Sequence, residues 1–149
     1  MKESTGDLWD AKPEFIRCIT TNGIVKKDGC AVMGKGVALQ AARRFPKLLR
    51  LLGKYLKEFR NSVHSFGSEY RIISFPTKDD WREDSSLEII EESCQRLRDA
   101  FEYTELGYFV KKIYMPRPGC GCGNLNWKDV KPILEKYLDD RFIVVDRSR

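Results

Sequence analysis

The sequence predicts an α/β protein, a three-layer α/β/α sandwich with a mixed, largely parallel sheet. The first observation behind this prediction is that short apolar segments of strand length alternate with longer amphipathic segments. The second is a hydrophobic fraction of 42% over 149 residues, which is enough for a buried core without disulfide bonds. The chain has no internal repeat and no low-complexity linker, so we expect residues 1–149 to form a single domain.

The expected strands are apolar runs that stop at turn-forming residues: just before residues 6–9, and over 15–19, 62–66, 70–75, 108–115 and 142–145. The expected helices have apolar side chains every three or four positions, over residues 37–45, 48–59, 87–106 and 127–137. Ser85 and Glu88 have the spacing of a capping box for the third helix. Pro132 predicts that the fourth helix, which follows Asn126, has a distorted first turn or a later start.

Composition limits the compartment and the kinds of partner. Five cysteines, an odd number without a CxxC pair, argue against a disulfide framework and against a zinc site, so we expect no metal. His64 is the only histidine, and without a second one a hydrolytic triad is not expected. The net charge of +5 and the pI near 9 favour phosphate-bearing partners. No apolar run approaches the roughly 18 residues of a membrane span, and residues 1–10 do not resemble a signal peptide. We expect no membrane partner and a cytoplasmic location, or a nuclear or host-cytosolic one for a eukaryotic or viral source.

The stretch from Gly29 to Leu39 is a glycine-containing loop that leads directly into a helical pattern. Glycines let backbone amides approach a ligand, and a helix N-terminus offers free N–H groups to an anion. Gly29, Gly34 and Lys35 have Walker-loop spacing, but Gly36 stands where a triphosphatase needs a hydroxyl for magnesium. The sequence therefore predicts a phosphate-binding loop without triphosphatase chemistry. The alternative is a helix start whose glycines serve packing alone.

A second glycine loop, residues 119–125, also precedes a helix. Together the two loops can hold the two sides of one diphosphate, although the second could be an ordinary turn-rich connection. Asn22, Lys78 and Gly119 each follow a predicted strand. Because the carboxyl ends of parallel strands meet at one edge of a sheet, we expect these residues to gather around one ligand there.

Lys78 is the residue most suited to covalent chemistry. A lysine amine can attack the carbon of a sugar and form a Schiff base with its open-chain aldehyde. Asp79 and Asp80 oppose this role, because nearby carboxylates stabilise the charged ammonium form. The alternative is a solvent-exposed lysine in a charged loop.

The order and spacing of these motifs resemble the macrodomain family, over nearly the whole chain. The resemblance lies in Gly6-Asp7-Leu8, Thr21-Asn22, the run from Met33 to Ala38, and the run from Gly119 to Asn124. The sequence is most similar to the subgroup that contains terminal ADP-ribose protein glycohydrolase and the antitoxin macrodomain acting on ADP-ribosylated thymidine in DNA. Phe75-Pro76-Thr77-Lys78-x-x-Trp81-Arg82 resembles the antitoxin branch in particular.

The resemblance implies that ADP-ribose is the ligand, and that no cofactor is needed. It implies that Lys78 is catalytic, and that Asp7 contacts adenine, although Asp7 could instead be an N-cap or a surface acid. The full set of implied ADP-ribose-binding residues is Asp7, Leu8, Thr21, Asn22, Met33, Gly34, Lys35, Gly36, Val37, Pro76, Thr77, Gly119, Cys120, Gly121, Cys122, Gly123 and Asn124.

One departure concerns the acid that the protein glycohydrolase pairs with its lysine. The comparable place here holds Gly123 or Asn124, which fits the DNA-directed branch better. The implied activity is hydrolysis of ADP-ribosyl bonds to DNA thymidine or to protein carboxylates. The alternatives are a phosphatase of ADP-ribose 1″-phosphate and a non-catalytic reader of ADP-ribosylation. We expect a monomer, with ADP-ribosylated substrates and single-stranded DNA as candidate partners.

Overall fold

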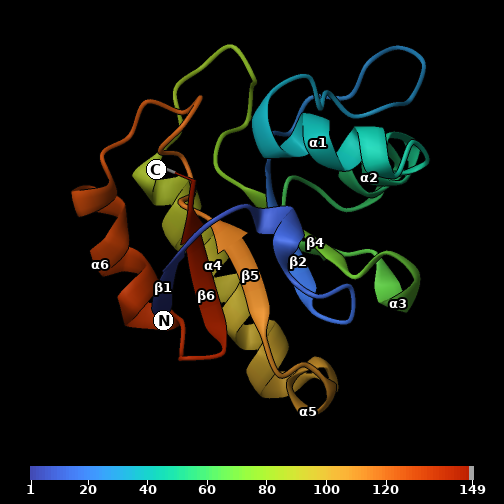
Figure 1. The fold of residues 1–149 in the computed structure, drawn as a ribbon. Helices are drawn as coiled ribbons and strands as arrows, with labels where there is room; N and C mark the ends of the chain where they lie inside the picture. The colour runs from blue at the N-terminus through green and yellow to red at the C-terminus, as the bar shows by residue number, and fades with distance from the viewer. Residues whose placement is uncertain (148–149) are drawn as a thin grey trace.

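The computed structural model describes residues 1–147, whose strands form one six-stranded sheet (Figure 1). The strand order is β1-β6-β5-β2-β4-β3, and only β3 runs antiparallel to its neighbour. The bounds are β1 Lys2–Thr5, β2 Ile16–Thr21, β3 His64–Ser65, β4 Ile72–Pro76, β5 Ile113–Pro116 and β6 Phe142–Asp146. This arrangement confirms the predicted mixed, largely parallel sheet.

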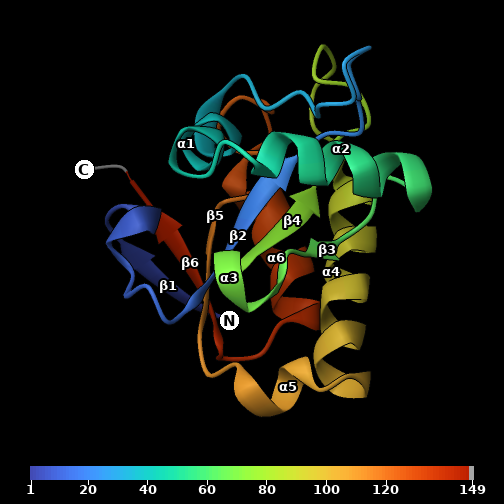
Figure 2. The same ribbon diagram turned by 90° about the vertical axis from the view of Figure 1, so that its right-hand side faces the viewer.

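Helices cover both faces of the sheet. The bounds are η1 Leu8–Asp10, α1 Gly36–Arg44, α2 Leu48–Glu58, α3 Gly67–Tyr70, α4 Leu87–Tyr103, α5 Leu106–Phe109 and α6 Trp127–Tyr137. Figures 1 and 2 show α4 and α6 together on one face, with α1 and α2 near the carboxyl ends of β2 and β4 on the other. The three layers follow from this placement, because the inner strands β2 and β4 bury side chains on both faces.

The central strand β2 shows how one segment serves two cores. Cys18 packs with α4 and α6, whereas the next residue, Ile19, packs with α1 and α2. Both side chains are fully buried. Successive side chains of a strand point to opposite faces, so a strand covered on both sides is a continuous apolar run. This burial holds the carboxyl ends of β2 and β4 in a fixed position for the site.

The start of α4 differs by one residue from the predicted capping box. Ser86, not Ser85, is the N-cap, and its hydroxyl accepts a hydrogen bond from the Ile89 N–H at 3.3 Å. Ser85 therefore lies outside the helix. Its backbone N–H donates to the carbonyl of Gly123 at 3.0 Å, which ties it to the second glycine loop.

Two segments predicted as strands are partly helical. Residues 106–109 form α5, and β5 begins only at Ile113. Tyr108 and Phe109 have high strand propensity, but they are 89% and 78% exposed, so no neighbouring strand packs against them. The predicted strand over residues 70–75 loses its first residue to the short helix α3, Gly67–Tyr70, and β4 begins at Ile72. The predicted strand over residues 62–66 is only two residues long, His64–Ser65.

Pro132 lies inside α6 without delaying its start. The N–H groups of Asp129 and Val130 both donate to the carbonyl of Asn126, at 3.0 and 3.2 Å. The helix therefore begins at Trp127, and the missing N–H of proline costs one bond further along.

Candidate functional site

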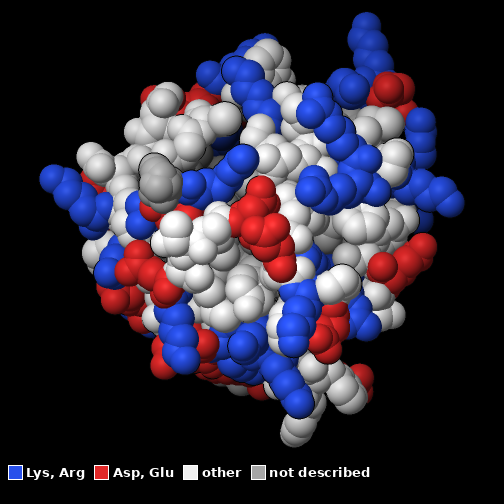
Figure 3. Space-filling model, viewed as in Figure 1, with Lys and Arg blue, Asp and Glu red and all other residues white. Residues whose placement is uncertain are grey.

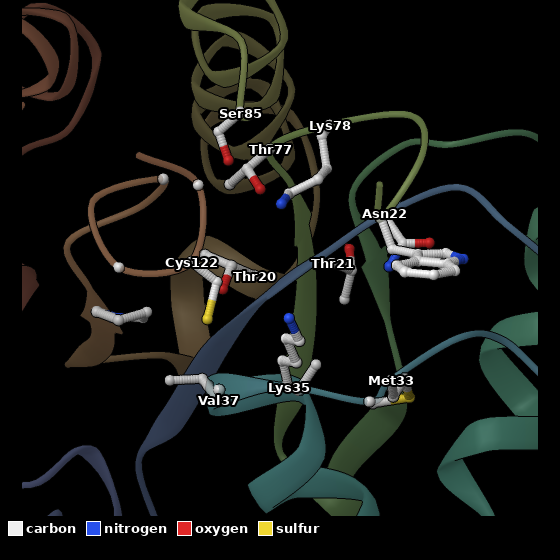
Figure 4. Close-up of a pocket in the computed structure, with 18 of the residues that line it drawn as sticks. Thr20, Thr21, Asn22, Met33, Lys35, Val37, Thr77, Lys78, Ser85 and Cys122 are labelled. Atoms are coloured by element: carbon white, nitrogen blue, oxygen red, sulfur yellow. The ribbon is translucent and has the colours of Figure 1, made fainter. Parts of the chain in front are cut away.

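A cavity of about 480 Å³ lies at the carboxyl ends of β2 and β4, between the N-terminus of α1 and the second glycine loop. Figure 4 shows side chains from these separate segments pointing into it. The residues that line it are Thr20, Thr21, Asn22, Val32, Met33, Gly34, Lys35, Gly36, Val37, Ala38, Thr77, Lys78, Trp81, Ser85, Pro116, Arg117, Gly119, Gly121, Cys122 and Gly123. The three strand-end residues Asn22, Lys78 and Gly119 therefore meet at one cavity.

Asn22 fixes the loop that precedes α1. Its Nδ2 donates to the carbonyl of Val32 at 3.0 Å, and its Oδ1 accepts from the N–H of Ile24 at 3.0 Å. The two bonds join the ends of residues 24–32, which an isolated bridge between Val25 and Ala31 also closes. Asn22 thus sets the position of Met33 and Gly34 at the cavity.

The N-terminus of α1 supplies backbone donors to the cavity. Lys35 is the N-cap residue, and its side chain makes no capping hydrogen bond. Gly36 has a φ of +56°, a left-handed conformation that glycine adopts at least cost. Gly36, Val37 and Ala38 all line the cavity. The first N–H groups of a helix lack intrahelical partners, so this end suits an anionic group.

The second glycine loop depends on glycine for close packing. A Cβ on Gly123 would lie 2.1 Å from Oγ of Ser85, and a Cβ on Gly119 would lie 2.9 Å from Cδ1 of Leu125. A side chain on Gly121 would meet nothing within 4 Å. The loop is closed by a hydrogen bond from the Leu125 N–H to the Gly119 carbonyl at 2.9 Å. Its backbone is therefore held against Ser85, while its tip stays open to the cavity.

Lys78 and Lys35 point into the cavity from opposite sides, toward one another (Figure 4). Lys78 is half-buried at the end of β4, whereas Lys35 is exposed. Two ammonium groups that face one space favour an anionic ligand between them. The predicted anion site and the predicted reactive lysine therefore occupy the same cavity.

The two acids that follow Lys78 are engaged elsewhere. Oδ1 of Asp79 accepts from Nδ2 of Asn61 at 2.9 Å. Asp80 accepts from Nε and Nη2 of Arg82 at 2.9 and 2.6 Å, and these hydrogen bonds lower the pKa of the Asp80 carboxyl to about 2. Both carboxylates thus have partners other than the Lys78 amine.

Several residues expected at the ligand do not line the cavity. The carboxylate of Asp7 accepts from the Trp9 N–H at 2.9 Å, so Asp7 caps the short helix η1, the alternative use considered for it. Nδ2 of Asn124 donates to Asp84 at 2.8 Å. The remaining residues of this group are Leu8, which is buried, Pro76, whose carbonyl accepts from Ser93, and Cys120, whose thiol donates to the Pro118 carbonyl.

The cavity is also lined by residues outside the predicted ligand-binding set: Thr20, Val32, Ala38, Trp81, Ser85, Pro116 and Arg117. Ser85 is the most unusual of them, because its buried hydroxyl has no hydrogen-bond partner. Figure 4 shows this hydroxyl pointing toward Thr77. The capping-box pattern assigned Ser85 to the start of α4, but Ser86 takes the N-cap and Ser85 lies one residue outside the helix, at the cavity.

Within residues 1–147, no group of three or more His, Cys, Asp or Glu side chains could hold a metal ion. In the same part of the chain, no helix is long and apolar enough to cross a membrane. The face shown in Figure 3 carries scattered Lys and Arg side chains, with a group of acidic side chains near its centre. The basic residues there do not form one continuous patch.

Comparison with known proteins adds to this description. No protein-family model matches the chain. A Thermus aquaticus protein named DNA ADP-ribosyl glycohydrolase is 34% identical over 146 residues, a match covering 90% of this chain and 36% of that protein. The chain spans about a third of the length of the curated relatives it matches.

Solved structures match over nearly the whole chain. The macrodomain of Mycobacterium tuberculosis DarG matches with a TM-score of 0.79 and 28% identity, covering 99% of this chain and 97% of that one. The macrodomain of Thermus aquaticus DarG matches with a TM-score of 0.76 and 29% identity, with the same coverage. These matches, with the 34% identical Thermus aquaticus relative, show that the chain belongs to the macrodomain family. Within that family it groups with the DarG macrodomains.

Proposed function

We propose that this chain binds ADP-ribose in the cavity and hydrolyses the bond between ADP-ribose and thymidine in DNA. The observation that carries the proposal is the placement of Lys78 with its amine inside a cavity formed by both glycine loops. The name of the Thermus aquaticus relative, DNA ADP-ribosyl glycohydrolase, supports the reaction and the substrate.

In this proposal the diphosphate lies between the N-terminus of α1 and the second glycine loop. Backbone N–H groups of Gly36 and Val37 donate to one side, and those of Gly121 and Cys122 donate to the other. Oriented amides and a helix N-terminus bind phosphate oxygens without the cost of ordering flexible side chains. Lys35 adds a positive charge near the same oxygens. The distal ribose then extends toward Lys78.

Lys78 acts as the nucleophile in the proposed reaction. Its neutral amine attacks the anomeric carbon, the bond from that carbon to the base nitrogen breaks, and the base leaves with the electron pair and takes up a proton. The ribose ring of the sugar–lysine adduct then opens, which gives a Schiff base between the opened ribose and the lysine. Water then releases ADP-ribose and restores the amine. Thr77 and Asn22, which line the cavity on either side of Lys78 in Figure 4, would contact the ribose hydroxyls.

The test offers purified protein two substrates: an oligonucleotide with one ADP-ribosylated thymidine, and a protein ADP-ribosylated on glutamate. Released ADP-ribose is measured by chromatography for wild type, Lys78→Ala and Lys54→Ala. Lys54 is an exposed lysine of α2 that does not line the cavity, so it serves as the matched control. We expect wild type and Lys54→Ala to cleave the DNA substrate, and Lys78→Ala to lose cleavage by at least about a hundredfold.

Other outcomes point to the alternatives. Release of phosphate from ADP-ribose 1″-phosphate, unaffected by Lys78→Ala, would favour the phosphatase. Tight binding of ADP-ribose by calorimetry without any turnover would favour a reader. Cleavage of the glutamate-linked substrate alone would move the proposal to protein de-ADP-ribosylation.

A further inference from the structure

Trp81 lies at the cavity three residues after Lys78 and is 49% exposed. A large aromatic ring left half in water on a loop gains little for folding, because much of its apolar area stays hydrated. It lines the same cavity as Lys78 and Thr77. Its position suits contact with a ligand rather than a role in the core.

The loop that carries Trp81 is firmly anchored. Nδ2 of Asn61 donates to the Lys78 carbonyl at 3.0 Å, and the N–H of Gly23 donates to the Asp79 carbonyl at 2.9 Å. The Arg82 guanidinium is held by Asp80, and its Cζ lies 5.6 Å from the centroid of the Trp81 ring. A ring with such supports can present its face at little entropic cost.

Lys78 and Trp81 belong to the same anchored loop and both line the cavity. The position of the Trp81 ring relative to Lys78 is therefore fixed by the loop. If Lys78 attacks the anomeric carbon, the group attached to that carbon must leave beside this loop. Trp81 is the large aromatic side chain among the cavity-lining residues. A planar acceptor group released beside Lys78 would therefore share the cavity with an indole ring.

We propose that Trp81 is the stacking platform for the acceptor nucleobase, and that it makes the site prefer a base-linked ADP-ribose over a carboxylate-linked one. The inference rests on the proposed function and names the acceptor that the site selects. Stacking of a base on an aromatic side chain depends on the π-face of the base, which a carboxylate linkage lacks.

The charges around Trp81 fit a base better than a phosphate at this position. The charge of Arg82 beside the ring is offset by its ion pair with Asp80, and the exposed Glu83, together with Asp79 and Asp84, adds negative charge to the same loop, which repels a phosphate backbone or an acidic peptide. The neighbouring loop, joined through the bond from Gly23 to Asp79, carries the exposed Lys26 and Lys27. The strand's phosphates are therefore better accommodated on that side, while the modified base lies against Trp81.

The test compares Trp81→Ala and Trp81→Phe with wild type on both substrates, measuring kcat/KM, with the melting temperature as a check of folding. Tyr103→Ala is the matched control, since Tyr103 is an aromatic residue at the end of α4, 79% exposed and not at the cavity. We expect Trp81→Ala to lower kcat/KM for the DNA substrate about tenfold to a hundredfold, and for the glutamate-linked substrate less than about threefold. Trp81→Phe keeps most of the activity, and Tyr103→Ala matches wild type.

A binding arm separates this inference from the proposed reaction. In a Lys78→Ala background, calorimetry compares free ADP-ribose with the ADP-ribosylated oligonucleotide. We expect the oligonucleotide to bind more tightly, and Trp81→Ala to remove that advantage while free ADP-ribose binds within about twofold of its original affinity. Unchanged cleavage and unchanged oligonucleotide affinity in Trp81→Ala, or an equal loss on both substrates, would overturn the inference. Wild type that cleaves neither substrate would refute the reaction, and the binding arm would still decide the role of Trp81.

Discussion

Replacing Gly123 by alanine tests the close packing that shapes the second glycine loop. An added Cβ would lie 2.1 Å from Oγ of Ser85, 2.7 Å from Cβ of Ser85 and 2.6 Å from the carbonyl oxygen of Gly119. Non-bonded carbon contacts are favourable near 3.5–4.0 Å, so all three distances are repulsive. Ser85 is only 7% exposed, so its side chain cannot move aside into solvent.

The expected cost follows from these contacts. Overpacking of a well-filled region costs about 1–3 kcal/mol. Moving the loop outward also weakens the bond from the Ser85 N–H to the Gly123 carbonyl, which costs about 1 kcal/mol more. A total of about 3 kcal/mol in the free energy of unfolding lowers the melting temperature of a chain this size by about 6–12 °C.

The assay is thermal unfolding followed by circular dichroism, with Gly121→Ala as the matched control. A Cβ on Gly121 would touch nothing within 4 Å, so this variant should melt within about 2 °C of wild type. Adding Ser85→Gly to Gly123→Ala removes two of the three close contacts and should recover part of the loss. A Gly123→Ala variant as stable as wild type, or a double variant with purely additive losses, would refute the reasoning.

Three further predictions concern stability. Gly53→Ala should lower the melting temperature by several degrees despite better helix propensity, because its Cβ would lie 2.0 Å from the Gly29 carbonyl oxygen; an unchanged value would contradict this. Ser86→Ala removes the cap on the Ile89 N–H and should cost about 1 kcal/mol in urea unfolding, whereas no shift in the midpoint would contradict the cap. Burial raises the pKa of the Cys94 thiol to about 12, above its unfolded value near 9. The buried, protonated Cys94 thiol therefore contributes its full share of the free energy of unfolding below pH 9. As the pH rises toward 12 this contribution is lost, by up to about 1.4 kcal/mol per pH unit, because the unfolded chain loses the thiol proton first. Cys94→Ala should lose less stability over that range, and equal losses would refute the assignment.

The convergence of strand ends could be predicted from sequence because it follows from topology. Asn22, Lys78 and Gly119 each come after an apolar strand, and parallel strands share their carboxyl edge, so no contact needed to be known in advance. The glycine loops were predictable for a similar reason, since glycine before a helical pattern is a local signal. These features account for the cavity and the placement of its charges.

Most of the rest depends on contacts between distant segments, which local patterns do not report. Tyr108 and Phe109 favour a strand by propensity, but no strand edge lies beside them, and a short helix forms instead. Ser85 fits a capping box by spacing, yet its neighbour takes the cap and Ser85 packs under the second glycine loop. Asp7 follows a strand end, and its carboxylate caps the turn beside it, while its contact with adenine stays a prediction. For Tyr108, Phe109 and Ser85, tertiary packing decided between two locally allowed uses of the residue, whereas the bond of Asp7 is a local one to a residue two positions away.

The most direct measurement traps the proposed adduct between ADP-ribose and the protein. A Schiff base between the opened ribose and a lysine is reduced by borohydride to a stable secondary amine, which peptide mass spectrometry assigns to one residue. During turnover of ADP-ribosylated DNA, we predict an ADP-ribose adduct on the peptide that contains Lys78 and none in Lys78→Ala. An adduct on Lys35 instead, or steady cleavage by wild type with no trapped lysine, would contradict the account.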